Sequence, residues 1–341
     1  MTTAKKILVI RNDKIGDFML SWPSFALLKR QYPGSEITAL VPQYTASLAE
    51  KCEWIDNIII DEREPSSLKD ILDLSKKIKV ARFDASISLF SETRTALALW
   101  LARVPLRIGP ATKLAQIFLN RRLRQKRSRS AKPEYEYNLD LVKYYIELNA
   151  DTAVAQQEPP FLYFDKAETS ALRDHLAKDY SLSANTKIII IHPGTGGSAI
   201  NLSAEQYAEL ADRIAKKRDV YFVITAGPGE LTIAKKLSSL INSAHHIHAS
   251  DSGIIDFCKF LSIGDLFISG STGPLHIAGA LNLNTAAFYP ARRSATALRW
   301  QTVNSPDKRL SFSPDNYTGE NDMMRIDIAK SADTITDTFL S

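Results

Sequence analysis

Short apolar runs, separated by longer stretches with helical spacing, are the feature that most constrains the fold of this chain. Runs of this kind predict β-α units built around buried parallel strands. They occupy residues 7–10, 37–41, 57–60, 85–90 and 106–108 in the first half, and 187–191, 220–225, 245–248, 266–269 and 285–289 in the second. Each half has enough strands for its own open sheet, with connections long enough for helical crossovers. The sequence therefore predicts an α/β protein with two doubly wound, Rossmann-like domains.

The chain has 341 residues, which agrees with two domains at roughly 100–200 residues each. The pattern is interrupted at residues 156–160, before a helix predicted over 166–178. We expect an N-terminal domain over residues 1–165, a C-terminal domain over 166–326, and a final helix over 327–341. Ligands of doubly wound sheets bind beyond the carboxyl ends of the strands, so we expect a site in a cleft between the domains.

Two glycine-containing loops in the second half follow predicted strands and precede predicted helices. Glycine lets the backbone approach a ligand closely, and a helix N-terminus supplies unpaired N–H groups suited to phosphate. A plain strand-to-helix turn is the alternative for the first loop, and a packed core histidine is the alternative for His276. The predicted phosphate-binding residues are Thr195, Gly196, Gly197 and Ser198 in the first loop, and Ser271, Thr272, Gly273, Pro274 and His276 in the second.

Two carboxylates, Asp13 and Asp17, flank Lys14 in the loop after the first predicted strand. A carboxylate there can take the proton of an attacking hydroxyl group within hydrogen-bond reach. The alternative is that Asp17 only caps the following helix. Capping would lower the pKa of Asp17, so a role as a base requires burial to restore its basicity.

Further charged residues follow other strands of the second half. Glu230 is suited to a hydrogen bond from a ribose or a base edge, and equally to stabilising a helix N-terminus. Arg292 and Arg293 are candidates for a phosphate contact, with an ordinary solvated pair as the alternative. No Asp-x-Asp occurs, and the two cysteines lie far apart. We therefore expect no metal and no other cofactor.

Four segments, in this order and spacing, resemble the lipopolysaccharide heptosyltransferases of glycosyltransferase family 9. They are residues 7–17, 191–197, 227–230 and 271–276, and the resemblance covers most of the chain. It implies a GT-B fold with an ADP-heptose donor held by the C-terminal domain, and inversion at the anomeric carbon without a metal. It also implies that the final helix crosses back onto the N-terminal domain.

The resemblance further implies roles for single residues. Asp17 would be the general base, Glu230 would contact the nucleoside, and the two glycine loops would hold the diphosphate. Many family members have Asp at the position of Ser271 and Lys or Arg at that of Ile200. These departures leave open a different nucleotide sugar, or a protein that binds a nucleotide sugar without turnover.

The net charge of +5 lies entirely in the first half, which has 25 Lys and Arg against 20 Asp and Glu up to Asp165. Between Glu92 and Glu134 there are eleven basic residues and no acidic one. Because guanidinium groups suit phosphate, Arg121, Arg122 and Arg124 are candidates to bind the acceptor. Asp13 and Lys14, in the loop after the first predicted strand, are further candidates for acceptor binding. Leu114 and Ile117 add an apolar edge for an interface. A phosphorylated Kdo–lipid A acceptor in an anionic leaflet fits this stretch.

Nucleic acid is the rival partner for a basic stretch. The neutral second half and the lack of a recognisable nucleic-acid module argue against it.

The apolar run 7–10 is too short for a signal peptide, and no stretch has about 20 continuous apolar residues. We therefore expect a monomer in the cytoplasm that transiently contacts the inner membrane.

Overall fold

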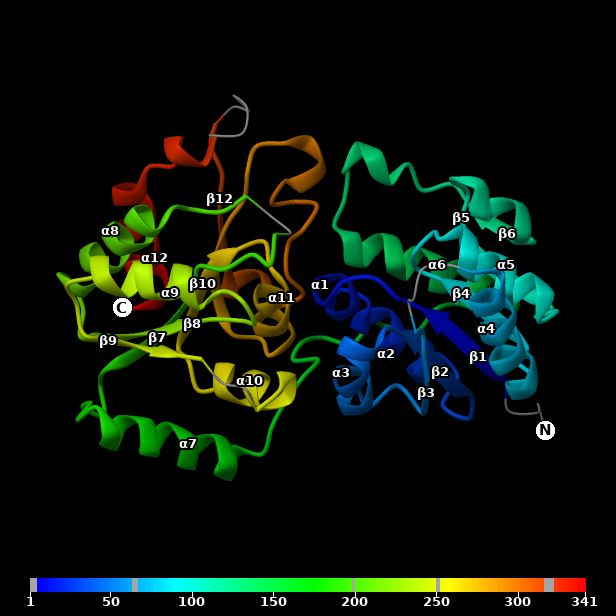
Figure 1. Cartoon of the computed structure of the whole chain (residues 1–341), viewed down its shortest axis with the longest axis horizontal. Coiled ribbons are helices and arrows are strands. Elements are labelled where there is room, and N and C mark those ends of the chain that lie inside the picture. Colours follow the sequence, from blue (N-terminus) through cyan, green and yellow to red (C-terminus); the bar gives the residue numbers. More distant parts are fainter. Residues whose placement is uncertain (1–4, 63–66, 198–199, 250–251, 316–321) are drawn as a thin grey trace. The chain divides into compact units, whose positions relative to one another are not determined.

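The computed structural model describes residues 5–62, 67–197, 200–249, 252–315 and 322–341. In these ranges the strands form two six-stranded sheets, and every strand pair is parallel (Figure 1). The first sheet contains β1 (Lys6–Ile10), β2 (Glu36–Val41), β3 (Asn57–Ile60), β4 (Ala85–Ser88), β5 (Leu106–Pro110) and β6 (Arg121–Leu123). The second contains β7 (Lys187–His192), β8 (Val220–Thr225), β9 (His245–His248), β10 (Leu266–Gly270), β11 (Asn284–Phe288) and β12 (Arg309–Phe312).

The strand orders are β3-β2-β1-β4-β5-β6 and β12-β11-β10-β7-β8-β9. All ten predicted strands are present, and most of them have buried apolar side chains. The exceptions are the edge strands β3 and β9, whose side chains are partly exposed. The sequence analysis missed β6 and β12. Both are edge strands with Arg residues and partly exposed side chains, so neither has the apolar run that marks a buried strand.

Most successive strands of each sheet are linked by a helix, and parallel crossovers of this kind are right-handed in nearly all proteins. Along the first sheet the chain steps from β1 to β3 in one direction and from β4 to β6 in the other, so this rule puts the helices of the two series on opposite faces. The first half contains α1 (Ile15–Met19), α2 (Trp22–Gln31), α3 (Ala46–Lys51), α4 (Leu68–Ala81), α5 (Thr93–Leu101) and α6 (Glu134–Leu148), with short 3₁₀ turns η1 (Gln43–Thr45), η2 (Leu114–Phe118) and η3 (Arg127–Arg129).

The second half contains α7 (Lys166–Asp179), α8 (Ala204–Ala215), α9 (Leu231–Leu240), α10 (Ile254–Leu261), α11 (Gly273–Ala280) and α12 (Ile328–Phe339), with η4 (Arg293–Ala295), η5 (Pro306–Lys308) and η6 (Asp322–Arg325). Among the described residues, no helix has the length and apolarity needed to cross a membrane.

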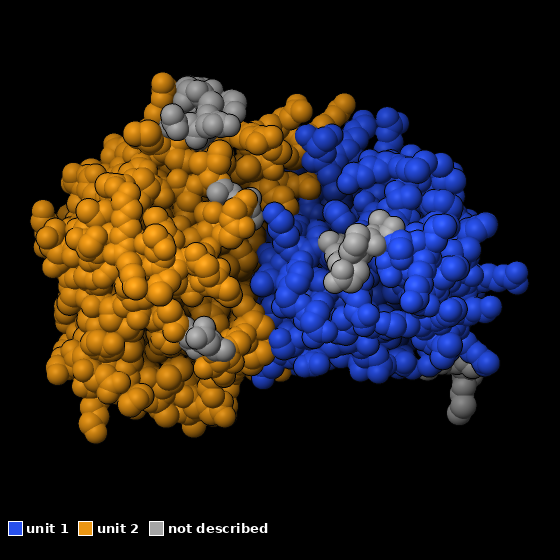
Figure 2. Space-filling view, in the orientation of Figure 1, with its two compact units in different colours: residues 1–128, 132–157 blue, residues 129–131, 158–341 orange. Residues whose placement is uncertain are grey.

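The chain divides into two compact units, coloured separately in Figure 2. Unit 1 comprises residues 1–128 and 132–157, and unit 2 comprises 129–131 and 158–341. The division at 157/158 comes slightly earlier than the expected boundary at 165/166. The reason is that residues 161 and 162 already bond to unit 2, where their backbone N–H groups donate to the Ala280 carbonyl oxygen.

Helix α12 belongs to unit 2. It packs against α8. Its buried face, which includes Ile328, Ala332 and Ile335, joins the apolar core formed with β7 and β8. This face fills the second core, so the helix is part of the unit that precedes it in the sequence.

Candidate functional site

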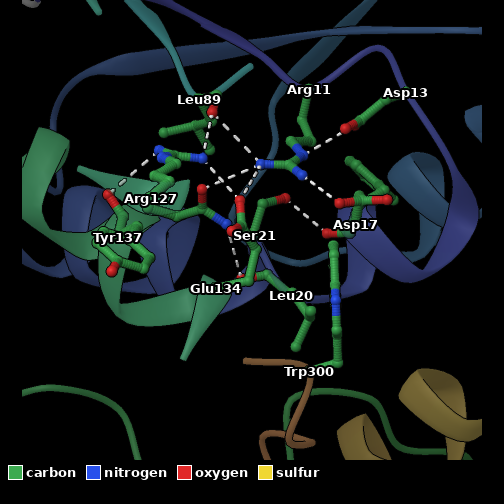
Figure 3. Close-up of polar contacts among 12 residues, drawn as sticks. Arg11, Asp13, Asp17, Leu20, Ser21, Leu89, Arg127, Glu134, Tyr137 and Trp300 are labelled. Atoms are coloured by element: carbon green, nitrogen blue, oxygen red, sulfur yellow. Dashed lines mark hydrogen bonds and ion pairs between the residues drawn. The ribbon is translucent and has the colours of Figure 1, made fainter. Parts of the chain in front are cut away.

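The first candidate site lies where the strand order of unit 1 reverses, between β1 and β4, and its central residue is Arg11. Arg11 directly follows β1 and its side chain is only 2% exposed. Its Nη1 donates to the Leu89 carbonyl oxygen at 3.3 Å, to Asn138 Oδ1 at 3.1 Å and to Glu134 Oε1 at 3.2 Å (Figure 3). Loops at such a reversal point form the usual ligand crevice of doubly wound sheets.

Both aspartates predicted for this loop bind the same guanidinium group. Arg11 Nε donates to Asp13 Oδ1 at 2.8 Å, and Arg11 Nη2 donates to Asp17 Oδ1 (Figure 3). The alternative reading of Asp17 as a helix cap is wrong, because the N-cap residue of α1 is the exposed Lys14 and no side chain caps that helix. No described residue donates a hydrogen bond to Asp17 Oδ2, which leaves this oxygen for a ligand.

The electrostatics of the cluster favour a proton on Asp17. Burial raises the pKa of Asp17 to about 7, the Arg11 guanidinium opposes this shift, and the Asp13 and Glu134 carboxylates add to it. Burial also raises the pKa of Asp13. Asp17 therefore meets the condition set by the sequence analysis, since burial has restored its basicity. A carboxylate with this pKa is a stronger base than an ordinary aspartate and is still partly ionised at neutral pH.

Helix α6 completes the cluster with residues that the sequence analysis missed. Glu134 begins α6, is only 2% exposed and accepts from Arg127 Nη1 at 2.6 Å as well as from Arg11. Arg127 Nη1 also donates to the Leu89 carbonyl oxygen at 3.0 Å. The feature of the sequence that could have pointed to Glu134 is that it is the first acidic residue after the eleven basic ones. Burial of that carboxylate requires a cationic partner, and Arg127 and Arg11 supply it.

The other residues of the basic stretch fall into two groups. Arg94 pairs with the buried Asp61, Arg107 donates to the carbonyl oxygens of Val104 and Phe118, and Lys132 pairs with Asp140. The second group is exposed and forms no ion pair with a described residue; it comprises Arg103, Lys113, Arg121, Arg122, Arg124, Lys126 and Arg129. The predicted acceptor residues Arg121, Arg122 and Arg124 thus lie on or directly after the edge strand β6, outside the Arg11 cluster.

The second candidate site lies at the corresponding reversal point of unit 2, between β7 and β10. His192 of β7 lies beside Ser269 of β10, so the two predicted glycine loops leave neighbouring strands. Gly196 and Gly197 are exposed and have φ angles of +53° and +72°, which favour glycine. Thr195 precedes them, and Ser198 lies outside the described residues.

Glu230 ties this first loop to the turn after β8. Its Oε1 accepts from the Gly196 N–H at 2.7 Å, and its Oε2 accepts from the Gly227 N–H at 2.9 Å. Its carboxylate packs so closely on Gly194 that a Cβ there would lie 2.2 Å from Glu230 Cδ. Glu230 is the N-cap residue of α9, but its side chain forms no capping hydrogen bond there. The hydrogen bond with His192, together with these N–H groups, lowers the pKa of Glu230 to about 2.

His192 connects Glu230 to the end of β8. The buried His192 ring places Nε2 3.3 Å from Glu230 Oε2 and Nδ1 3.0 Å from Thr225 Oγ1. Each ring nitrogen of His192 therefore has a polar partner, Nε2 in the Glu230 carboxylate and Nδ1 in the Thr225 hydroxyl group. The loop conformation therefore depends on side chains from β7, from β8 and from the turn that precedes α9.

The second glycine loop leads into α11, whose N-cap is Thr272. The Thr272 hydroxyl accepts from the Leu275 N–H at 3.4 Å, and Pro274 lies in the first turn. Gly273 begins the helix and Ser271, which is half-buried, precedes the cap. Burial lowers the pKa of His276 to about 4, so its ring is neutral at pH 7 and donates at most one N–H.

Comparison with known proteins gives the family of the chain. The family model for glycosyltransferase family 9 (heptosyltransferase) matches residues 71–308. A Haemophilus influenzae protein described as a glycosyltransferase is 46% identical over 91% of this chain and 89% of its own length. The chain belongs to glycosyltransferase family 9.

Two other proteins are similar to this chain over most of its length. The lipopolysaccharide core heptosyltransferase OpsX of Haemophilus influenzae is 23% identical over 93% of this chain and 87% of its own length. The structure of the Escherichia coli ADP-heptose lipopolysaccharide heptosyltransferase II superposes with a TM-score of 0.78 at 20% identity, and covers 98% of each chain. The fold is therefore the GT-B fold of family 9, and the protein is a glycosyltransferase of the heptosyltransferase family.

Ile200 stands where many family members have Lys or Arg, and its surroundings are apolar too. Ile200 is partly buried and packs against the core of unit 2. Arg292 and Arg293 are exposed in and beside η4, after β11, and neither forms a hydrogen bond or ion pair with a described residue of the glycine loops. Neither Arg292 nor Arg293 therefore replaces the missing cation by direct contact with a described residue of these loops.

Proposed function

We propose that this family 9 enzyme transfers a heptosyl group from ADP-heptose to the Kdo or heptose inner core of lipopolysaccharide, with Asp17 as the general base. The observation that carries this proposal is the Arg11-bound Asp17 carboxylate, which has a pKa of about 7 and an oxygen with no partner among the described residues. The donor and acceptor classes are supported by the similarity to a lipopolysaccharide core heptosyltransferase and to an ADP-heptose enzyme.

In the proposed reaction, Asp17 Oδ2 takes the proton of an acceptor hydroxyl group. The acceptor oxygen attacks the anomeric carbon from the side opposite the diphosphate, and the bond from that carbon to the phosphate oxygen breaks. ADP leaves as an anion and the configuration inverts. Arg11 holds the Asp17 carboxylate in one orientation throughout.

We propose that donor binding and departure of ADP need no metal. The backbone N–H groups of Gly196 and Gly197 and the N-terminus of α11 would stabilise the diphosphate electrostatically. Glu230 would act here mainly by holding the loop, since both of its oxygens already accept backbone hydrogen bonds. On the acceptor side, the exposed Arg121, Arg122 and Arg124 would bind the phosphates of a Kdo–lipid A acceptor. Such an acceptor locates the reaction at the cytoplasmic face of the inner membrane.

A second candidate is transfer from another nucleotide sugar, because Ile200 packs into the core where many family members have a cation. Calorimetry or thermal unfolding with ADP-heptose, UDP-sugars and GDP-sugars separates the two candidates. A donor at 100 times its Kd should stabilise the protein by about 2.7 kcal/mol. Stabilisation by ADP-heptose alone, followed by ADP release with Kdo–lipid A, is the expected result. Stabilisation only by another nucleotide sugar would refute the proposed donor.

A further inference from the structure

An exposed apolar cluster on unit 1 combines α5 with η2. Beneath it, Ala96 of α5 packs with Ala115 and Leu119 of the η2 segment, and the rings of Trp100 and Phe118 lie 6.1 Å apart. Above these contacts the side chains of Trp100, Leu114 and Ile117 reach solvent, with exposures of 50%, 61% and 66%. These contacts on the inner side of η2 hold the segment in place. Its outer side is apolar and has no partner among the described residues.

The 3₁₀ geometry of η2 places the two aliphatic residues on one face. A 3₁₀ helix has three residues per turn, so Leu114 and Ile117 lie one above the other. A soluble domain rarely exposes a contiguous group of large apolar side chains without a binding partner. Trp beside aliphatic side chains is typical of surfaces that enter the boundary between lipid headgroups and acyl chains.

Unpaired cations border this cluster. Arg103 follows Trp100 by one turn, and its N–H donates to the Trp100 carbonyl oxygen at 3.0 Å. Lys113 directly precedes η2, and its ammonium lies 5.5 Å from the Phe90 ring centroid. Arg121 and Arg122 follow η2 on the edge strand β6. All four are exposed, and none forms an ion pair with a described residue.

We propose that Trp100, Leu114 and Ile117, together with Arg103 and Lys113, form a docking surface for an anionic lipid bilayer; we call it the α5–η2 surface. The apolar side chains enter the headgroup boundary while the cations meet lipid phosphates. Charge complementarity selects this occupant over a second copy of the chain, because two such cationic surfaces repel each other. The inference deepens the proposed function and rests on its lipid-anchored acceptor.

Flotation with phosphatidylcholine vesicles, with or without phosphatidylglycerol, tests the proposal without any sugar. The protein should bind only the vesicles that contain phosphatidylglycerol, and added salt should release it. The double variant Leu114→Asp/Ile117→Asp should bind at least about 30-fold more weakly, because an anionic surface repels each new charge. Its thermal unfolding should match the wild type, because both side chains are exposed.

The matched control is Leu240→Asp/Met324→Asp, which adds the same two charges at exposed apolar positions of unit 2 and should bind like the wild type. Absence of vesicle binding, equal binding by the Leu114/Ile117 variant, a dimer that this variant dissociates, or DNA binding in place of vesicle binding would each overturn the proposal. Transfer to a deacylated, soluble acceptor should be the same in this variant and the wild type. If the wild type fails to transfer to that acceptor while vesicle binding persists, the proposed function fails instead.

Discussion

At the scale of single residues, the Arg11 cluster explains why the pKa of one aspartate is raised. Three carboxylates, those of Asp13, Asp17 and Glu134, share the guanidinium groups of Arg11 and Arg127. With fewer cations than anions in a buried site, one carboxylate holds its proton to a higher pH than usual. Asp17 is the member whose pKa rises to about 7.

This pKa has a thermodynamic consequence that does not involve substrate. A raised carboxyl pKa means that the folded protein holds the proton more tightly than the unfolded chain does. The resulting stabilisation is complete below pH 3.8, the ordinary value, and is lost as the pH rises through about 7. Between these values, the free energy of unfolding of the wild type should fall relative to Asp17→Asn by up to about 1.4 kcal/mol per pH unit.

Urea unfolding at a series of pH values measures this difference. Asp73→Asn, which removes an exposed carboxylate of α4, is the control and should follow the wild type. A difference between wild type and Asp17→Asn that does not change with pH would show that Asp17 titrates normally.

At the scale of elements, side chains from β7, from β8 and from the turn that precedes α9 position the glycine loop after β7. The sequence located the loop and the α11 N-terminus because glycine, threonine and proline have strong local preferences. It did not predict that Glu230 would bind Gly196, which lies 34 residues earlier, because that contact depends on the order of the strands. The Arg11–Glu134 contact spans 123 residues and was unpredictable for the same reason.

The substitution Glu230→Gln tests whether the Glu230 carboxylate holds the glycine loop through Gly196 and Gly227. Glutamine keeps one carbonyl oxygen but turns an NH₂ group toward the second backbone donor, so one N–H loses its acceptor. The free energy of unfolding should fall by about 1.5–3 kcal/mol, the range for hydrogen bonds to a charged group. The donor Kd should rise by about tenfold, equivalent to about 1.4 kcal/mol, because binding must then order the loop.

Glu209→Gln is the matched control, since Glu209 forms an exposed ion pair with Arg213 on α8. It should change the free energy of unfolding by less than about 1 kcal/mol. If Glu230→Gln is as harmless as this control in both measurements, Glu230 does not hold the loop.

At the scale of the whole molecule, the sequence predicted both doubly wound sheets, because buried parallel strands have apolar runs that stand out from their surroundings. It could not assign α12. The amphipathic pattern of that helix shows that one face is buried, but it does not identify the core that the face joins. The sequence also could not show which basic residues are available to a partner. Arg127 and Arg94 form internal ion pairs, whereas Arg103 and Lys113 are exposed.

The rate of ADP release by Asp17→Asn, with ADP-heptose and Kdo–lipid A as substrates, tests the proposal that Asp17 is the general base. Asparagine keeps the size of the side chain and an oxygen that can accept from Arg11, but it cannot take a proton from the acceptor. The rate should fall by about 10²–10⁴-fold, while the donor Kd measured by calorimetry stays at the wild-type value. A wild-type rate of ADP release in this variant would contradict the assignment of Asp17 as the base.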